Sequence, residues 1–167
     1  MSNQGHPGPR IVVYGNSGAG KTTLARRLAE AGALPILSLD AIAFEEGAVR
    51  KPLAESVRSL EEFATAHDAW VIEGCYGDLV EAALPFATEL RFLDPGVERC
   101  IAHCRARPWE PDKYPTRADQ DAMLENLIAW VETYESRDDE FGAARHRAIF
   151  ERFVGEKVRV TDSAAPL

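Results

Sequence analysis

A glycine-rich segment between an apolar run and a helical pattern constrains the fold of this chain most. Residues Gly15 to Thr22 read GNSGAGKT and match the pattern G-x-x-x-x-G-K-[ST] at every fixed position. The β-branched and aromatic run Ile11–Tyr14 precedes it and predicts a strand buried on both faces. Leu24, Leu28 and Ala31 follow at helical spacing. We therefore expect a strand, a tight turn and a helix in succession.

This segment has the chemistry of a phosphate-binding loop. Its glycines allow backbone N–H groups to turn inward around phosphate oxygens, and the dipole of the following helix adds positive potential. Lys21 supplies a point charge for the β- and γ-phosphates, and Thr22 supplies a hydroxyl for Mg²⁺. The predicted nucleotide-binding residues are Gly15, Asn16, Ser17, Gly18, Ala19, Gly20, Lys21, Thr22 and Thr23.

Strand and helix patterns alternate along the rest of the chain. Further strands are expected at residues 36–39, 70–72, 90–93 and 158–160, and further helices at 53–60, 79–84, 97–104, 118–134 and 141–153. This alternation predicts an α/β domain with a parallel sheet covered on both faces, whose carboxyl strand ends carry the binding chemistry. We expect one domain over residues 10–162, between flexible ends at 1–9 and 163–167.

Two carboxylates follow predicted strands on the same edge as the phosphate loop. Asp40 comes after the second strand and Glu73 ends the third. A carboxylate there can take the proton of an attacking hydroxyl or hold a water bound to Mg²⁺. We predict Asp40 as catalytic and Glu73 as a metal ligand through water, beside Thr22; Asp40, Glu73 and Tyr76 are also substrate candidates. The alternative for each carboxylate is an ordinary strand end or helix cap.

A proline-rich segment interrupts the second half of the chain. Residues Arg107 to Pro115 read RPWEPDKYP and can form neither a regular helix nor a central strand. Arg105, Arg107 and Arg117 flank or begin this loop, and arginines above the phosphates can neutralise charge during phosphoryl transfer. We predict a lid at about residues 105–117 with Arg107 as a catalytic residue. A solvated basic loop is the alternative.

Two further groups of residues have helical spacing. Arg145 and Arg147 in the last helix are substrate candidates, with a solvated helix face as the alternative. Cys100, His103 and Cys104 share one face of a helix and could offer three metal ligands. Core packing is the favoured interpretation of this face, because cysteine is among the most buried residue types.

Composition excludes several classes of function. The chain has 167 residues, a net charge of −8 and no basic run at either end, which argues against nucleic-acid binding. No apolar stretch reaches the roughly 20 residues needed to span a membrane, and three cysteines fit reduced thiols. We expect a cytoplasmic protein, a monomer or weak dimer, whose partner is a small-molecule acceptor.

The strings VVYGNSGAGKTTLARRLAE, LSLDAIAF and VIEGCYGDLV resemble small kinases described as topology-modulation proteins or as shikimate kinase. The whole arrangement is similar to the adenylate kinase and shikimate kinase group of P-loop phosphotransferases. This resemblance implies a three-layer P-loop NTPase fold with a five-stranded parallel sheet in the order 2-3-1-4-5, flanked by helices, and an Arg-bearing lid. It also implies ATP as the nucleotide, with Asp40 meeting the acceptor and Arg107 reaching over the nucleotide.

Two functional hypotheses follow. The first is a Mg²⁺- and ATP-dependent kinase that moves the γ-phosphoryl group to a hydroxyl or phosphate of a small molecule, as nucleoside, nucleotide or shikimate kinases do. The second is a P-loop NTPase that acts as a nucleotide switch on a protein partner. The turn from Glu73 to Tyr76 stands where shikimate kinases resemble one another in three glycines, so the acceptor is left open.

Overall fold

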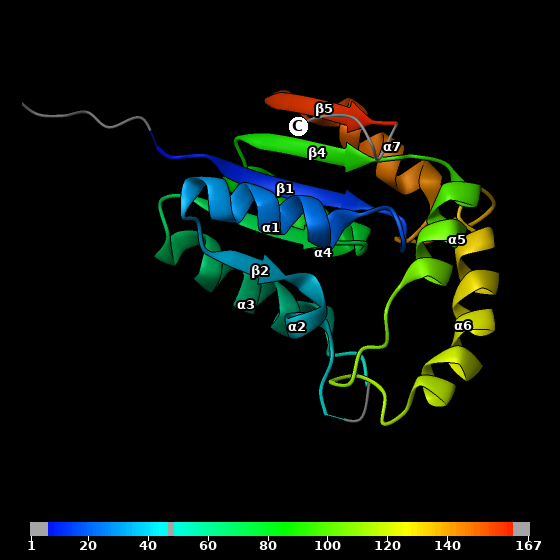
Figure 1. Ribbon diagram of the computed structural model, residues 1–167. Helices are drawn as coiled ribbons and strands as arrows, with labels where there is room; N and C mark the ends of the chain where they lie inside the picture. The colour runs from blue at the N-terminus through cyan, green and yellow to red at the C-terminus, as the bar shows by residue number, and fades with distance from the viewer. Residues whose placement is uncertain (1–6, 47–48, 162–167) are drawn as a thin grey trace, which may run out of the picture.

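The computed structural model describes residues 7–46 and 49–161. Five strands in this part of the chain form one parallel sheet in the order β2-β3-β1-β4-β5 (Figure 1). The strands are β1 (Arg10–Gly15), β2 (Ile36–Ser38), β3 (Trp70–Gly74), β4 (Glu89–Leu93) and β5 (Glu156–Val160). The sheet and its strand order confirm those that the resemblance implied.

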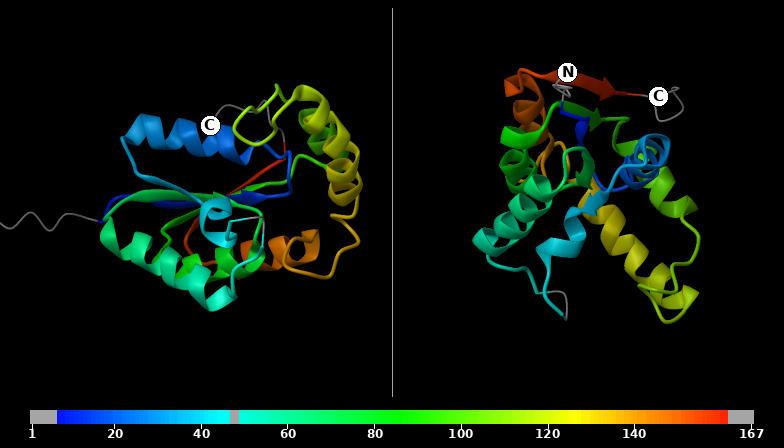
Figure 2. Two further views of the ribbon diagram at one scale, coloured as in Figure 1. Left: turned by 90° about the horizontal axis from the view of Figure 1, so that it is seen from below. Right: turned by 90° about the vertical axis from the view of Figure 1, so that its left-hand side faces the viewer.

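Helices connect the strands and cover both faces of the sheet. They are α1 (Lys21–Gly32), α2 (Leu39–Ala43), α3 (Leu53–Ala66), α4 (Gly77–Ala83), the short 3₁₀ helix η1 (Leu84–Phe86), α5 (Val97–Ala106), α6 (Arg117–Glu132) and α7 (Ala143–Arg152). Figure 2 shows α1 on one side of the sheet and α3, α4 and α7 on the other. The result is the predicted three-layer arrangement.

Alternate residues of the central strand enter two separate cores. Val12 and Tyr14 pack with side chains of α3, α4 and α7, whereas Ile11 and Val13 pack with side chains of α1, α5 and α6. All four side chains are at most 5% exposed. A strand buried on both faces requires the continuous apolar run seen in the sequence, so the pattern places β1 at the centre of the sheet.

The second strand is shorter than predicted. It ends at Ser38, and residues predicted to finish it begin helix α2, so Asp40 lies in the first turn of a helix and not at a strand end. Leu39 is fully buried against Gly74 of β3, where even a Cβ atom would lie 2.7 Å from Leu39 Cβ. An acidic residue in a first helical turn also interacts favourably with the helix dipole, which supports the early start of α2.

The proline-rich segment is a loop, as predicted, and joins α5 to α6 at the carboxyl ends of the strands (Figure 1). Before β1, Pro9 accepts a hydrogen bond from Trp70 N at 2.9 Å. The rest of the predicted flexible ends, residues 1–6 and 163–167, lies outside the described residues. Within the ranges described, no helix is long and apolar enough to cross a membrane.

Candidate active site

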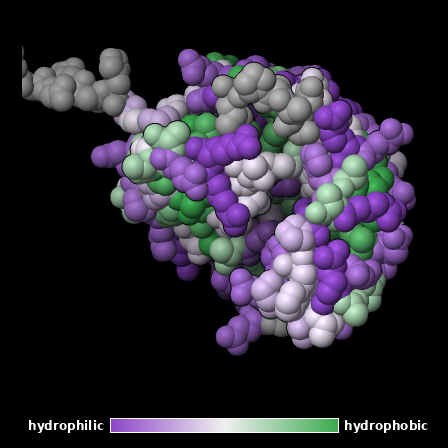
Figure 3. Space-filling model, in the orientation of Figure 1, coloured by the Kyte–Doolittle hydropathy of each residue, from purple (hydrophilic) through white to green (hydrophobic). Residues whose placement is uncertain are grey.

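A cavity of about 1130 Å³ opens at the carboxyl ends of the strands. The phosphate loop and α1 form one wall, the β3–α4 turn and α2 form a second, and the loop after α5 forms a third. Figure 3 shows this face hollowed between the two sides of the molecule. The predicted site residues that line the cavity are Ser17, Gly18, Ala19, Gly20, Lys21, Thr22, Thr23, Asp40, Glu73, Tyr76 and Arg107.

Two glycines give the phosphate loop its shape. Gly18 and Gly20 have φ values of 80° and 96°, a left-handed conformation that side chains disfavour. A Cβ atom on Gly18 would also lie 2.4 Å from the Cys100 carbonyl oxygen and 2.8 Å from Cys104 Sγ. The loop therefore sits directly on α5, and a residue larger than glycine at this position would push the two apart.

Asn16 connects the phosphate loop to α6. Its side chain is 3% exposed, accepts a hydrogen bond from Ser17 N at 2.8 Å and donates one to Val131 O of α6 at 3.4 Å. Lys21 Nζ donates to the Asn16 carbonyl oxygen at 2.7 Å. The lysine thus folds back over the loop, while the Asn16 side chain serves the loop's own geometry and is not part of the cavity wall.

The cavity wall opposite the loop, formed by the β3–α4 turn and α2, contains a hydrogen-bonded pair. Tyr76 Oη donates to Asp40 Oδ1 at 2.6 Å. Burial, together with the hydrogen bond to Asp40, raises the pKa of Tyr76, so its phenol stays protonated as a donor. The Arg50 guanidinium lies over the Tyr76 ring, 4.7 Å from its centre. Tyr76 therefore fixes the orientation of the Asp40 carboxylate.

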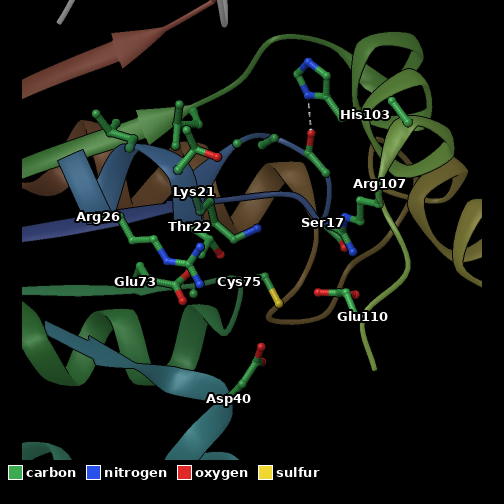
Figure 4. Close-up of a pocket in the computed structure, with 18 of the residues that line it drawn as sticks. Ser17, Lys21, Thr22, Arg26, Asp40, Glu73, Cys75, His103, Arg107 and Glu110 are labelled. Atoms are coloured by element: carbon green, nitrogen blue, oxygen red, sulfur yellow. Dashed lines mark hydrogen bonds between the residues drawn. The ribbon is translucent and has the colours of Figure 1, made fainter. Parts of the chain in front are cut away.

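Glu73, predicted as a metal ligand through water, lines the same cavity as Thr22. It ends β3, is 6% exposed and lies on the same side of the cavity as Thr22 (Figure 4). Figure 4 also shows Arg26 of α1 pointing toward Glu73. The sequence pattern did not predict Arg26 as a site residue, because arginine on an amphipathic helix usually faces solvent. Among residues 7–46 and 49–161, no group of three or more His, Cys, Asp or Glu side chains could hold a metal ion.

His103 contacts the phosphate loop, which the sequence did not predict. Its Nδ1 lies 2.6 Å from the Gly18 carbonyl oxygen (Figure 4). Because a carbonyl oxygen only accepts, Nδ1 must carry the proton. Cys100 and Cys104 on the same helix are 1% and 2% exposed, as predicted for core residues. The helical face interpreted as core packing therefore also braces the loop.

The loop over the cavity is held in shape by one glutamine of α6. Gln120 Oε1 accepts from Glu110 N at 2.7 Å, and its Nε2 donates to Pro108 O at 3.0 Å. Trp109 Nε1 donates to Tyr114 O within the same loop at 3.1 Å. These bonds hold the loop in a conformation in which Arg107 and Trp109 line the cavity.

Arg107 is the one of the three arginines at this loop that lines the cavity. Arg105 pairs with Glu125 at 3.3 Å, and Arg117 pairs with Asp121 at 3.1 Å, both along α6. The Arg105 guanidinium of α5 therefore faces a carboxylate of the neighbouring helix, and the Arg117 guanidinium faces one of its own helix. The closing movement expected of a lid stays a prediction.

The chain was compared with protein families, curated proteins and solved structures, and only the solved structures gave matches. No family model and no curated protein matches the sequence. Shikimate kinase from Acinetobacter baumannii, solved with shikimate, superposes with a TM-score of 0.55 at 16% identity, over 95% of this chain and 86% of that one. A sugar kinase from Janibacter gives a TM-score of 0.53 at 20% identity, over 93% and 87%. Shikimate kinase from Bacteroides thetaiotaomicron gives 0.53 at 20% identity, over 94% and 89%.

The chain has the fold of the P-loop small-molecule kinases. Within this kinase fold, α7 does not deliver its arginines to the cavity. Arg145 makes two hydrogen bonds to Glu81, at 2.9 and 2.6 Å, and Arg147 makes two to Glu135, both at 2.8 Å. Neither side chain lines the cavity. The two substrate candidates predicted on this helix therefore face other carboxylates.

What α7 does bring to the candidate site is a buried histidine. His146 is fully buried, and its Nε2 lies 2.9 Å from the Cys75 carbonyl oxygen in the turn before Tyr76. Since that oxygen only accepts, Nε2 carries the proton and Nδ1 accepts from Tyr134 Oη at 2.9 Å. Burial lowers the pKa of His146 to about 4. The neutral imidazole thus connects α6 and α7 to the β3–α4 turn.

We expect His146 to make the protein less stable as the pH falls. Its pKa is 6.5 when unfolded and about 4 when folded, so the unfolded state binds the proton first. The stabilisation is complete above pH 6.5 and is lost as the pH falls through the window down to 4. Urea unfolding should give a free energy of unfolding lower by about 2–3 kcal/mol at about pH 4.5 than at about pH 7.5.

The His146→Phe variant should lose most of this pH dependence, whereas His67→Gln on the exposed end of α3 should keep it. An unchanged pH dependence in His146→Phe would show that another group titrates in this window.

Proposed function

We propose that this protein is an ATP-dependent phosphotransferase that moves the γ-phosphoryl group to a small molecule. One observation carries the proposal: a single cavity has the phosphate loop on one wall and the Asp40–Tyr76 pair on the opposite wall. Pockets for one ligand usually enclose about 300–1,000 Å³. At about 1130 Å³, this cavity has room for a nucleotide and an acceptor side by side.

The residues present fit a nucleotide with Mg²⁺. Backbone N–H groups of the glycine-rich loop and Lys21 would bind the phosphates, with the Thr22 hydroxyl and, through water, Glu73 holding Mg²⁺. Hydroxyl, carboxylate and water oxygens are the ligands that Mg²⁺ prefers. The ion supplies neutralisation of charge on the phosphate oxygens.

In this proposal, Asp40 carries out the chemistry at the acceptor. As the acceptor hydroxyl oxygen bonds to the γ-phosphorus, its proton passes to the Asp40 carboxylate, and the bond from that phosphorus to the ADP oxygen breaks. Tyr76 holds the carboxylate by its hydrogen bond to Oδ1. Arg107, at the start of the loop over the cavity, would stabilise the charge that develops on the transferred group. The three cysteines are free thiols, which suits the cytoplasmic setting that we propose.

The test is ADP release measured with Mg-ATP against nucleoside monophosphates, nucleosides, shikimate, sugars and small hydroxy acids. A Lys21→Ala preparation run in parallel reveals any contaminating kinase. We expect at least one acceptor class to raise ADP release well above the acceptor-free rate. ATP binding with no response to any acceptor would contradict the proposal and favour a nucleotide switch.

A further inference from the structure

The two ends of the cavity differ in charge. We define the acceptor end as Asp40, Glu73, Cys75 and Tyr76. Burial raises the pKa of the Cys75 thiol to about 11 and also raises that of Tyr76, so both side chains stay uncharged. The acidic side chains of this end are Asp40 and Glu73, and carboxylate oxygens accept hydrogen bonds.

Arginines that surround the acceptor end are engaged by carboxylates elsewhere. Arg50 stacks on Tyr76, lies 3.4 Å from Asp78 Oδ2 and 3.6 Å from Glu140 Oε1, and does not line the cavity. Arg145 is held by both carboxylate oxygens of Glu81. These charges are compensated before any acceptor binds.

The cations that do line the cavity belong to the other end or to the loop above it. Lys21, Arg26 and Arg27 are on α1, which begins at the phosphate loop, and Arg107 and Lys113 are on the loop after α5. Arg26 points toward Glu73 (Figure 4), so its charge is directed at a carboxylate. Apart from Arg26, the positive charge of the cavity therefore lies at the phosphate loop and on the loop above it.

We infer that the acceptor is an uncharged, polyhydroxylated small molecule, a polyol or sugar, and not a carboxylic acid or a phosphate ester. This inference rests on the proposed kinase function. Hydroxyl groups supply the donors that the Asp40 and Glu73 carboxylates require. An anionic group bound beside Asp40 would face this carboxylate, whose hydrogen-bond partner is the neutral Tyr76 phenol, because the Arg26 charge is directed at Glu73. Like charges placed that closely are a strong means of rejecting a ligand.

Matched pairs of acceptors test the inference directly. Glucitol is compared with gluconate, and methyl shikimate with shikimate, because each pair differs at one end by the anionic group. Phosphorylated product is measured by mass spectrometry beside ADP release. We expect kcat/KM to be at least about 10-fold higher for the uncharged member of a pair that is turned over. Equal or faster transfer to the acid would overturn the inference.

Arg50 provides a second, independent measurement. If no acceptor anion is held there, Arg50→Met should change kcat/KM by the same factor for both members of a pair, even if the variant is less stable. A loss confined to the acid would show that Arg50 binds its carboxylate, and the inference would be wrong. Transfer only to acids or phosphate esters leaves the kinase proposal standing and overturns the inference. ATP binding without transfer to any acceptor of the wider panel contradicts the kinase proposal and the inference together.

Discussion

Lys21→Ala is expected to lower kcat/KM for Mg-ATP by about 10³-fold while the protein stays folded. In the structure, Lys21 Nζ makes a hydrogen bond to the Asn16 carbonyl oxygen at 2.7 Å and lines the cavity. The side chain is partly exposed, so its loss removes little packing. What disappears is the positive charge beside the transferred phosphoryl group, where charge is stabilised most in the transition state.

Turnover is measured by coupled ADP release, and folding by circular dichroism and thermal unfolding. Arg58→Ala is the matched control, because it also removes a cation from an exposed helical position but lies on α3 outside the cavity. Full turnover in Lys21→Ala would show that the assigned role of Lys21 is wrong. Collapse of the melting temperature would show instead that the lysine is structural.

Asp40→Asn is expected to lower kcat by about 10²–10⁴-fold and to leave the Kd for ATP nearly unchanged. In the structure, Tyr76 Oη lies 2.6 Å from Asp40 Oδ1. The amide oxygen of the variant can still accept this hydrogen bond, so the cavity wall at α2 and the β3–α4 turn keeps its shape. An amide cannot take the proton of the acceptor hydroxyl. The loss should therefore fall on the chemical step.

ATP affinity is followed by calorimetric titration and turnover by product formation. Asp78→Asn is the control, since it makes the same change on α4 at a residue that pairs with Arg50 and does not line the cavity. A parallel loss of ATP affinity and turnover in Asp40→Asn would place this carboxylate with the nucleotide. In that case Tyr76→Phe should weaken ATP binding as well.

Most of the fold could be predicted from the sequence, because each strand and helix has its own pattern of apolar residues, glycines and prolines. The run Ile11–Tyr14 placed the central strand, and the glycine-rich loop placed the start of α1. The pattern failed at Asp40, where burial of Leu39 against β3 starts a helix that strand periodicity does not indicate. The spacing of apolar residues along β2 cannot indicate how this segment packs against β3.

The missed parts of the site all depend on contacts between distant segments. Gln120 holds a loop that ends before α6, His103 reaches Gly18, and His146 reaches Cys75. A lone glutamine or histidine in a helix has no periodicity that identifies its partner. Arg145 and Arg147 were wrongly grouped with the site for the same reason. Their carboxylate partners, Glu81 and Glu135, lie outside α7 in the sequence and are brought close only by the packing of this helix.

Two helices that brace the phosphate loop also carry the ends of the loop over the cavity. α5 contacts Gly18 and ends where that loop begins, and α6 holds Asn16 through Val131 and starts where the loop finishes. A displacement of α5 and α6 would therefore move the phosphate loop and the overlying loop together. Thermodynamic coupling is reciprocal, so if a nucleotide that orders the phosphate loop also favours one position of the overlying loop, fixing that position would strengthen nucleotide binding by the same factor. Gating and nucleotide affinity would then evolve as one trait.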